Sequence, residues 1–85
     1  MATATAETIL SQLATIINEV VGVETSQISP ESSFSDDLGV DSLSMVEIIY
    51  AVEDSFNITI PEDESKNLRT VGDAVAHIER ALAAA

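Results

Sequence analysis

The stretch DDLGVDSLSMVEII, residues Asp36 to Ile49, carries the signal from which the rest of the fold can be read. Asp41 is a good N-cap, because its carboxylate can accept a hydrogen bond from a backbone amide in the first turn of a helix. The acids at positions 36, 37 and 41 would also lie near the positive end of that helix. We therefore predict a helix from Ser42 to about Phe56.

The sequence before this helix predicts another helix and a loop. Apolar residues recur at helical spacing from Ile9 to Val20, which indicates a helix from about Thr5 to Val21 with one buried face. Gly22 suits its C-terminal cap. Residues 22–40 are rich in Gly, Pro, Ser and Asp, which favour turns. We expect a long, ordered loop that is anchored in the core by Val23, Ile28, Phe34 and Leu38.

The sequence after the 42–56 helix predicts two more helices. Residues 57–60 could form a short strand but would have no strand to pair with, so we expect a turn there. A short helix is predicted from Pro61 to Leu68, because proline suits the first helical position. Thr70 and Asp73 resemble a capping pair, and the apolar spacing that follows predicts a helix from about Val71 to Ala83.

Length and composition agree with one small domain. Eighty-five residues provide too little apolar surface for two cores. We expect residues 1–85 to form a single all-α domain, a small four-helix bundle with three longer helices, one short third helix and the long loop between the first two. No apolar run reaches the roughly 18 residues of a membrane span. The first residues, MATATAE, also lack secretory features, so a cytoplasmic location is expected.

Charge narrows the possible partners. Fifteen acids against three basic residues give a net charge of -12, and no Lys or Arg precedes Lys66. Nucleic acid and anionic membranes would be repelled, whereas a basic protein partner would be attracted. The alternative is that acidity only keeps the chain soluble. The chain has no cysteine for a disulfide or a thiolate metal site, and its acids lack the spacing of a calcium loop, so no dedicated metal site is expected.

The 42–56 helix has two apolar faces when each residue is turned by about 100°. One face is a sufficient core stripe and holds Met45, Ile48, Ile49, Val52 and Phe56. The other holds Leu43, Val46 and Tyr50, bordered by Glu47, Asp54 and Glu53. An exposed apolar strip framed by acids would suit a partner with an apolar groove and a basic rim. The alternative is a central helix that is buried nearly all round.

Ser42 lacks the neighbours that activate a catalytic serine. A nucleophilic serine needs a base, and the only histidine is His77, which we expect on a polar, solvent-facing side of its helix. Ser42 could instead be modified by another protein's active site. A phosphate group there would meet free backbone amides and the favourable end of the helix dipole. This reading fits a simple phosphorylation site equally well.

The segment LGVDSLSMVEII, with FSDDL before it and IPEDES and LRTVGD after it, resembles acyl carrier proteins. The resemblance runs from Ile9 to Leu82 and is closest to the discrete carriers of bacterial type II fatty acid synthesis, of actinobacterial kind. It implies that Ser42, flanked by Asp41 and Leu43, receives 4'-phosphopantetheine from coenzyme A through a phosphopantetheinyl transferase acting with magnesium. The chain would then be a non-catalytic carrier that holds acyl groups as thioesters on the thiol of this arm.

The same resemblance implies where partners and cargo bind. The partners would be the malonyl transferase, ketosynthase, ketoreductase, dehydratase and enoyl reductase of fatty acid synthesis, each docking through a basic patch on a monomeric carrier. The matching recognition face consists of Leu43, Val46, Glu47, Tyr50, Glu53 and Asp54. The acyl chain would enter between the helices, toward Ile49, Ile60, Leu68 and Val71.

The chain departs from the family pattern at two positions, and two other functions remain open. Many fatty acid carriers have Ala where this chain has Val40 and an acid where it has Ser44. The long C-terminal extension of carriers that serve mycolic chains is also not expected. One alternative is a carrier for polyketide or aminoacyl groups, and another is an unmodified acidic helical adaptor that binds a basic partner.

Overall fold

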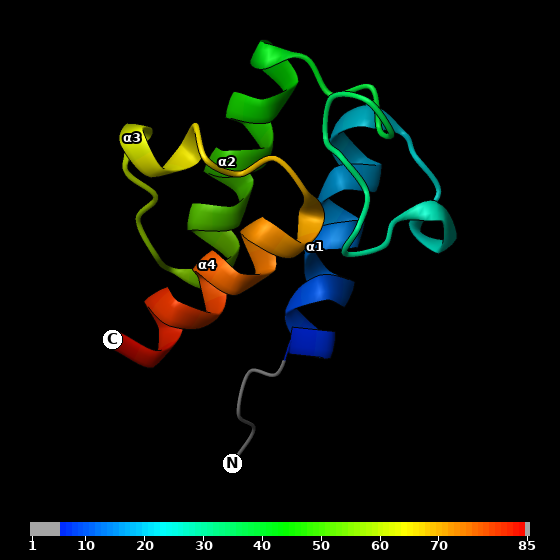
Figure 1. Cartoon of the computed structure of the whole chain (residues 1–85). Helices are drawn as coiled ribbons and strands as arrows, with labels where there is room; N and C mark the ends of the chain where they lie inside the picture. Colours follow the sequence, from blue (N-terminus) through cyan, green and yellow to red (C-terminus); the bar gives the residue numbers. More distant parts are fainter. Residues whose placement is uncertain (1–5, 85) are drawn as a thin grey trace.

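The computed structural model describes residues 6–84, and their fold is all-helical (Figure 1). The predicted fold class is confirmed: no strand occurs in the described range, which has only an isolated β-bridge between Ser33 and Thr70. The predicted helix start at Thr5 lies outside these residues. The elements are α1 (Ala6–Val21), the 3₁₀ helix η1 (Thr25–Gln27), α2 (Ser42–Phe56), α3 (Glu62–Ser65) and α4 (Val71–Ala84).

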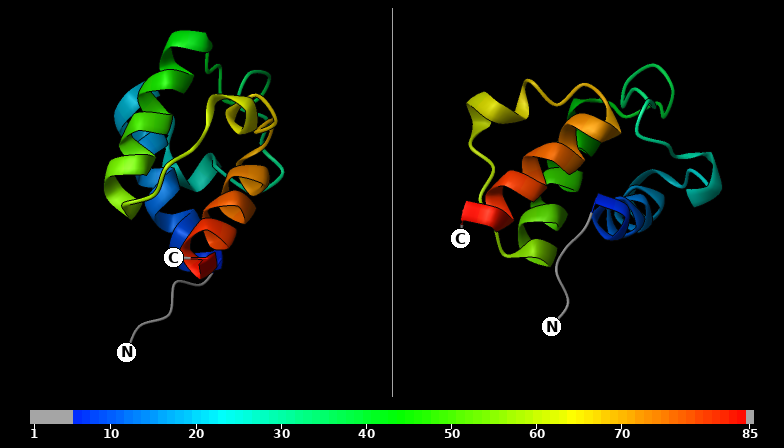
Figure 2. Two further views of the ribbon diagram at one scale, coloured as in Figure 1. Left: turned by 90° about the vertical axis from the view of Figure 1, so that its left-hand side faces the viewer. Right: turned by 60° about the horizontal axis from the view of Figure 1, so that its bottom comes forward.

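The central helix of the bundle is α1, which packs against both α2 and α4 (Figures 1 and 2). Burial of aliphatic side chains drives this packing, at roughly 1.5–3 kcal/mol for each fully buried side chain. The short α3 stands between α2 and α4, since its residues line hollows with both helices. The most deeply buried side chains come from three helices and are Ile9, Leu13, Ile17, Ile48, Val71 and Ile78.

The long loop between α1 and α2 is held to the core, as its spaced apolar residues predict. Ile28, Phe34 and Leu38 are buried, and Val23 is half-buried against the same core. Val40 is buried as well, although the sequence pattern did not single it out. The loop also contains η1, which was not predicted. Anchoring at several points explains how so long a connection keeps one conformation.

Backbone hydrogen bonds join this loop to the entrance of α4. The Phe34 amide donates to the Arg69 carbonyl at 3.0 Å, and the Val71 amide donates to the Ser32 carbonyl at 2.9 Å. The Gly72 amide donates to the Pro30 carbonyl at 2.8 Å, and a Cβ on Gly72 would lie only 3.0 Å from that oxygen. These contacts bring residues 30–34 beside residues 69–72, segments that are remote in the sequence.

Both ends of α2 lie where the sequence predicted them. The Ser44 amide donates to Asp41 Oδ1 at 2.8 Å, which confirms Asp41 as the N-cap. At the other end Asn57 adopts a left-handed conformation with φ of 56°, and its amide donates to the Glu53 carbonyl. Asparagine tolerates this conformation better than most residues, so it ends the helix without a glycine.

The prediction for α3 was too long. Pro61 lies outside the helix as its N-cap, with extended backbone, and the helix contains only Glu62–Ser65. The Lys66 amide reaches the Glu62 carbonyl at 3.4 Å, and the next two amides, of Asn67 and Leu68, donate to carbonyls three residues back. Tighter three-residue bonding ends an α-helix, which explains the early stop.

A reciprocal cap begins α4. The Asp73 amide donates to Thr70 Oγ1 at 3.1 Å, while the Thr70 amide donates to Asp73 Oδ2 at 3.2 Å. The predicted capping pair is therefore confirmed, and the helix ends at Ala84, one residue later than expected. The amide of Thr70, and then that of Arg69, stabilises the Asp73 carboxylate, so the pKa of this carboxyl lies below its ordinary value of 3.8.

The lowered pKa of Asp73 predicts a pH dependence of stability. Because the folded-state pKa is depressed, the stabilisation is present above about pH 3.8 and is lost as pH falls through the folded-state pKa. We expect Asp73→Asn to lower the melting temperature at pH 7, and the gap to wild type to narrow toward pH 3. Asp54→Asn, an exposed carboxylate on α2, is the matched control. A gap that stays constant from pH 7 to pH 3 would contradict the assignment.

Candidate functional site

Ser42 is exposed at the first position of α2. The neighbouring Asp41 does not activate it, because the Asp41 carboxylate is occupied by the Ser44 amide. That amide, followed by the Ser44 side chain, lowers the pKa of the Asp41 carboxyl, so Asp41 is an anionic cap and a poor general base. Within residues 6–84 the Ser42 hydroxyl has no hydrogen-bond partner. The hydroxyl is therefore accessible to another protein and is not set up as a nucleophile by its surroundings.

His77 lies in a different place from the one we expected. His77 is only 7% exposed, so the prediction of a solvent-facing histidine was wrong. Its Nδ1 lies 3.3 Å from Glu64 Oε1, which ties α4 to α3. Helix α3 covers this side of α4, and helical periodicity could not reveal that. His77 lines a hollow with Glu64, Asn67 and Arg80 that does not include Ser42. The structure thus does not bring Ser42 and His77 together.

A hollow of about 450 Å³ lies beside Ser42. Three segments form it: the end of the long loop, the first turn of α2, and the connection from α3 to α4. Its apolar walls are Phe34, Val40, Met45 and Leu68, and its charged residues are Asp36, Asp41, Lys66 and Arg69. Sequence reasoning missed the two basic residues, because the backbone contacts between residues 30–34 and 69–72 are what bring them there.

The second apolar face of α2 is exposed. The relative exposure is 72% for Leu43, 43% for Val46 and 66% for Tyr50. Glu47 and Asp54 are exposed beside them. The alternative in which α2 is buried nearly all round is therefore excluded. The core stripe is the opposite face, where Ile48 and Val52 are buried and Met45, Ile49 and Phe56 pack against the core.

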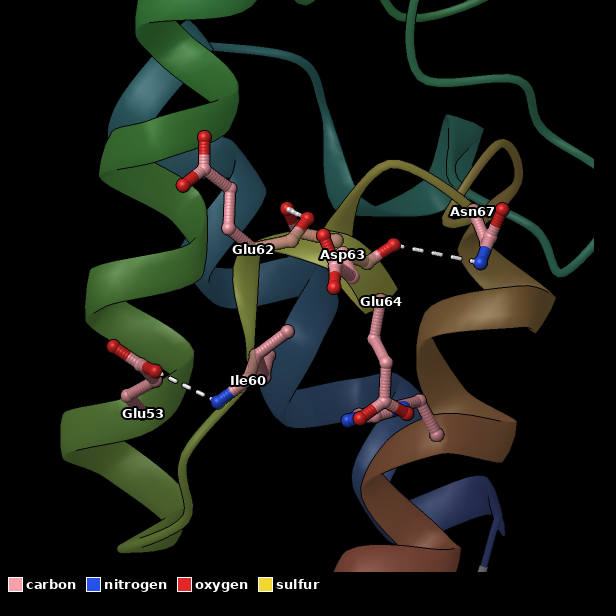
Figure 3. Close-up of polar contacts among 8 residues, drawn as sticks. Glu53, Ile60, Glu62, Asp63, Glu64 and Asn67 are labelled. Carbon is pink, nitrogen blue, oxygen red and sulfur yellow. Dashed lines mark hydrogen bonds and ion pairs between the residues drawn. The ribbon is translucent and has the colours of Figure 1, made fainter.

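Glu53 has an intramolecular role that the sequence did not suggest. Its Oε2 accepts a hydrogen bond from the Ile60 amide at 2.7 Å, across the turn that connects α2 to α3 (Figure 3). Its side chain is consequently less free than those of Glu47 and Asp54, and Glu53 is only half-exposed. A substitution at Glu53 would disturb the α2–α3 connection as well as any docking surface.

The residues predicted to surround an acyl chain are divided among three places. Ile49 and Ile60 line one hollow of about 310 Å³ between α2 and α3, together with Val46 and Tyr50. Leu68 lines the hollow beside Ser42. Val71 is fully buried in the core. In the closed bundle these positions do not form one continuous cavity.

Two further features of the described part of the chain concern metal ligands and membrane-spanning helices. Residues 6–84 contain no group of three or more His, Cys, Asp or Glu side chains arranged to hold a metal ion. None of the helices in this range has both the length and the apolar character that crossing a bilayer requires.

Known proteins similar to this chain are named acyl carrier proteins. The family pattern "Phosphopantetheine attachment site" matches residues 11–78. The acyl carrier protein of Acidothermus cellulolyticus is 60% identical over 79 residues, which are 93% of this chain and 94% of that protein. The meromycolate extension acyl carrier protein of Mycolicibacterium smegmatis is 53% identical over 91% of this chain and 78% of its own length. The solved structure of the acyl carrier protein from Enterococcus faecalis is 32% identical, covers 92% of this chain and 99% of its own, and superposes with a TM-score of 0.77.

Proposed function

Because this chain belongs to the acyl carrier proteins, the family whose covalent cofactor is 4'-phosphopantetheine, we propose that Ser42 is the residue that carries this arm. The observation that supports the assignment is the exposed hydroxyl at the start of α2, which has no partner within residues 6–84 and adjoins a large hollow. A phosphate bonded at this position would lie at the positive end of the α2 dipole, where the Ser44 amide is already bonded to Asp41. The residues present therefore fit the group.

Attachment would be a phosphoryl transfer catalysed by a phosphopantetheinyl transferase. The Ser42 oxygen would form a bond to the pantetheine-bearing phosphorus of coenzyme A, and the bond from that phosphorus to the bridging oxygen would break. The leaving group is then adenosine 3',5'-bisphosphate, and the hydroxyl proton goes to a base of the transferase. The base must come from the transferase, because the nearest acid, Asp41, is held as a low-pKa helix cap and His77 lies in another hollow.

With the arm in place, the chain would act as a non-catalytic carrier of acyl groups. The arm supplies a terminal thiol that holds acyl groups as thioesters, and the chain itself has no cysteine for this purpose. The surface of α2 formed by Leu43, Val46 and Tyr50 would dock on partner enzymes, with Glu47 and Asp54 meeting basic rims. We propose a monomer in the cytoplasm that serves the transferase, synthase, reductase and dehydratase enzymes of fatty acid synthesis.

The acyl chain would be sheltered between α2 and α3. The hollow that includes Ile49 and Ile60 offers the entrance. Leu68 and Val71 would form deeper walls only after the short α3 moves, because Val71 is fully buried in the closed bundle. Helix α3 contains only four residues, so its displacement would break few hydrogen bonds.

If acidic residues of α2 guide docking, reversing the charge of one of them should weaken the interaction with a partner enzyme, and the effect should depend on salt. Glu47→Lys should lower the rate at which a malonyl transferase acylates the arm-bearing protein, by roughly tenfold at low salt. The difference between the variant and wild type should be smaller at high salt, because salt screens the charges that guide docking. Melting temperature should barely change, since Glu47 is exposed. Glu19→Lys on α1 is the matched control. Equal effects at Glu47 and Glu19 would indicate that only net charge matters.

The carrier function is tested by loading the arm-bearing protein. Intact mass after incubation with malonyl-coenzyme A and a malonyl transferase of fatty acid synthesis should increase by one malonyl group. A parallel reaction with a transferase of polyketide synthesis distinguishes the two classes of carrier. Loading by the polyketide enzyme alone would overturn the fatty acid assignment, and failure of both enzymes would overturn the carrier proposal.

A further inference from the structure

The hollow beside Ser42 collects two of the three basic residues of this strongly acidic chain. Lys66 and Arg69 line it, whereas Arg80 lines the hollow around His77. Both side chains are exposed, and neither forms an ion pair within 4 Å with a carboxylate among residues 6–84, where the one such pair joins His77 to Glu64. Two cations thus line the same hollow as Ser42, in a protein that otherwise repels anions.

The same hollow contains carboxylates that would oppose a phosphate. Asp36 and Asp41 line it together with Ser42. The Asp41 charge is partly satisfied by the Ser44 amide, while Asp37 accepts a hydrogen bond from the Ser33 amide at 2.7 Å close by. Arg69 also interacts electrostatically with the Asp73 carboxylate of α4. The charge of Lys66 is therefore the more available of the two for a phosphate. A phosphodiester at Ser42 would need positive charge to offset this acidic surrounding.

We propose that Lys66 and Arg69 form a phosphate subsite that holds the phosphodiester of the arm against the body of the protein. This inference rests on the proposed attachment at Ser42. Lys and Arg are the side chains that pair best with phosphate, Lys as a point charge and Arg through its planar fork of donors. Apart from the two carboxylates, the rest of the lining is uncharged, with apolar Phe34, Val40, Met45 and Leu68 and the hydroxyl residues Ser33, Ser35 and Ser65, which suits an uncharged part of the arm. The subsite would direct the arm toward the α3–α4 connection.

The subsite can be tested by substitutions that remove the positive charges, with each variant studied in its arm-bearing and arm-free forms. Arg69→Gln and the double variant Lys66→Gln/Arg69→Gln are compared with Arg80→Gln, which removes the same charge away from Ser42. For each protein, the ³¹P chemical shift of the phosphodiester and the melting temperature of the arm-bearing and arm-free forms are measured. The difference between the two forms isolates the phosphate, because both forms have lost the same protein charge.

The double variant is expected to shift the ³¹P signal. The melting temperature of the arm-bearing form minus that of the arm-free form should be about 2–4 °C lower in the double variant than in wild type. Arg69→Gln should give part of this effect and Arg80→Gln none, and 0.5 M salt should reduce it. If the arm attaches but the double variant matches Arg80→Gln in both measurements, the subsite is overturned while the proposed function stands. If intact mass shows no arm on Ser42, the proposed function fails and the subsite with it.

Discussion

Ser42→Ala is expected to abolish attachment of phosphopantetheine completely while leaving the fold intact. The substitution removes the hydroxyl oxygen that we propose as the acceptor, so no transfer can occur at this position. The Asp41 cap and its bond to the Ser44 amide are unaffected, and Ser42 is exposed, so stability should change by no more than about 0.5 kcal/mol. Intact mass after incubation with coenzyme A, magnesium and a phosphopantetheinyl transferase checks the first effect, and thermal unfolding checks the second.

Ser44→Ala is the matched control for this substitution. It removes a hydroxyl two residues away in the same turn and should leave the mass gain unchanged. If Ser42→Ala still gains the arm, another hydroxyl is the acceptor. If it unfolds, the assignment of Ser42 as an exposed position without a structural role is wrong.

Of the substitutions proposed for this protein, Leu13→Ala is expected to cause the largest loss of stability. Leu13 has no exposed surface and lies in the middle of α1, the helix that contacts both α2 and α4. Truncating such a leucine costs about 2–5 kcal/mol, through lost burial and the cavity that remains. A domain of this size has a total stability of roughly 5–15 kcal/mol. The melting temperature should fall by about 8–40 °C, since each kcal/mol lowers it by about 4–8 °C in a domain of this length.

Leu43→Ala provides the comparison for the same chemical change on the surface. With 72% of Leu43 exposed, its truncation should change stability by no more than about 0.5 kcal/mol. Its effect should instead be a weaker interaction with partner enzymes. If both leucine variants lose equal stability, the division of the molecule into an α1-centred core and an exposed face of α2 is incorrect.

Local signals in the sequence were sufficient for most of the secondary structure. The start of α2 follows from the Asp41 cap, whereas the left-handed conformation of Asn57 that ends the helix was not predicted. The start of α4 follows from the reciprocal bonds of Thr70 and Asp73. Each of these signals acts within a few residues, so it is visible in sequence. Helix α3 lacks a side-chain N-cap and closes with tighter turns, which is why its predicted end was three residues too late.

Relations between distant segments were not predictable in the same way. Periodicity assigned the face of α2 that holds Ile48 and Val52 to the core, but it could not decide whether the second apolar face was exposed or also covered; the structure leaves the second face exposed. His77 was expected in solvent, yet Glu64 of α3 covers it. Lys66 and Arg69 lie beside Ser42 because the long loop is bonded to the entrance of α4, a contact between segments more than thirty residues apart. Neither the burial of His77 nor the position of Lys66 and Arg69 has a signal in a single sequence.

Tandem mass spectrometry of the peptide that contains Ser42 is the most direct test of the proposed carrier function. Wild-type protein is first incubated with coenzyme A, magnesium and a phosphopantetheinyl transferase, and the peptide is then fragmented to locate any added group. We expect one phosphopantetheine, bonded to Ser42. An arm on another serine, or no arm on protein that started without one, would contradict the proposal and would favour an acidic helical adaptor that docks through α2 without modification.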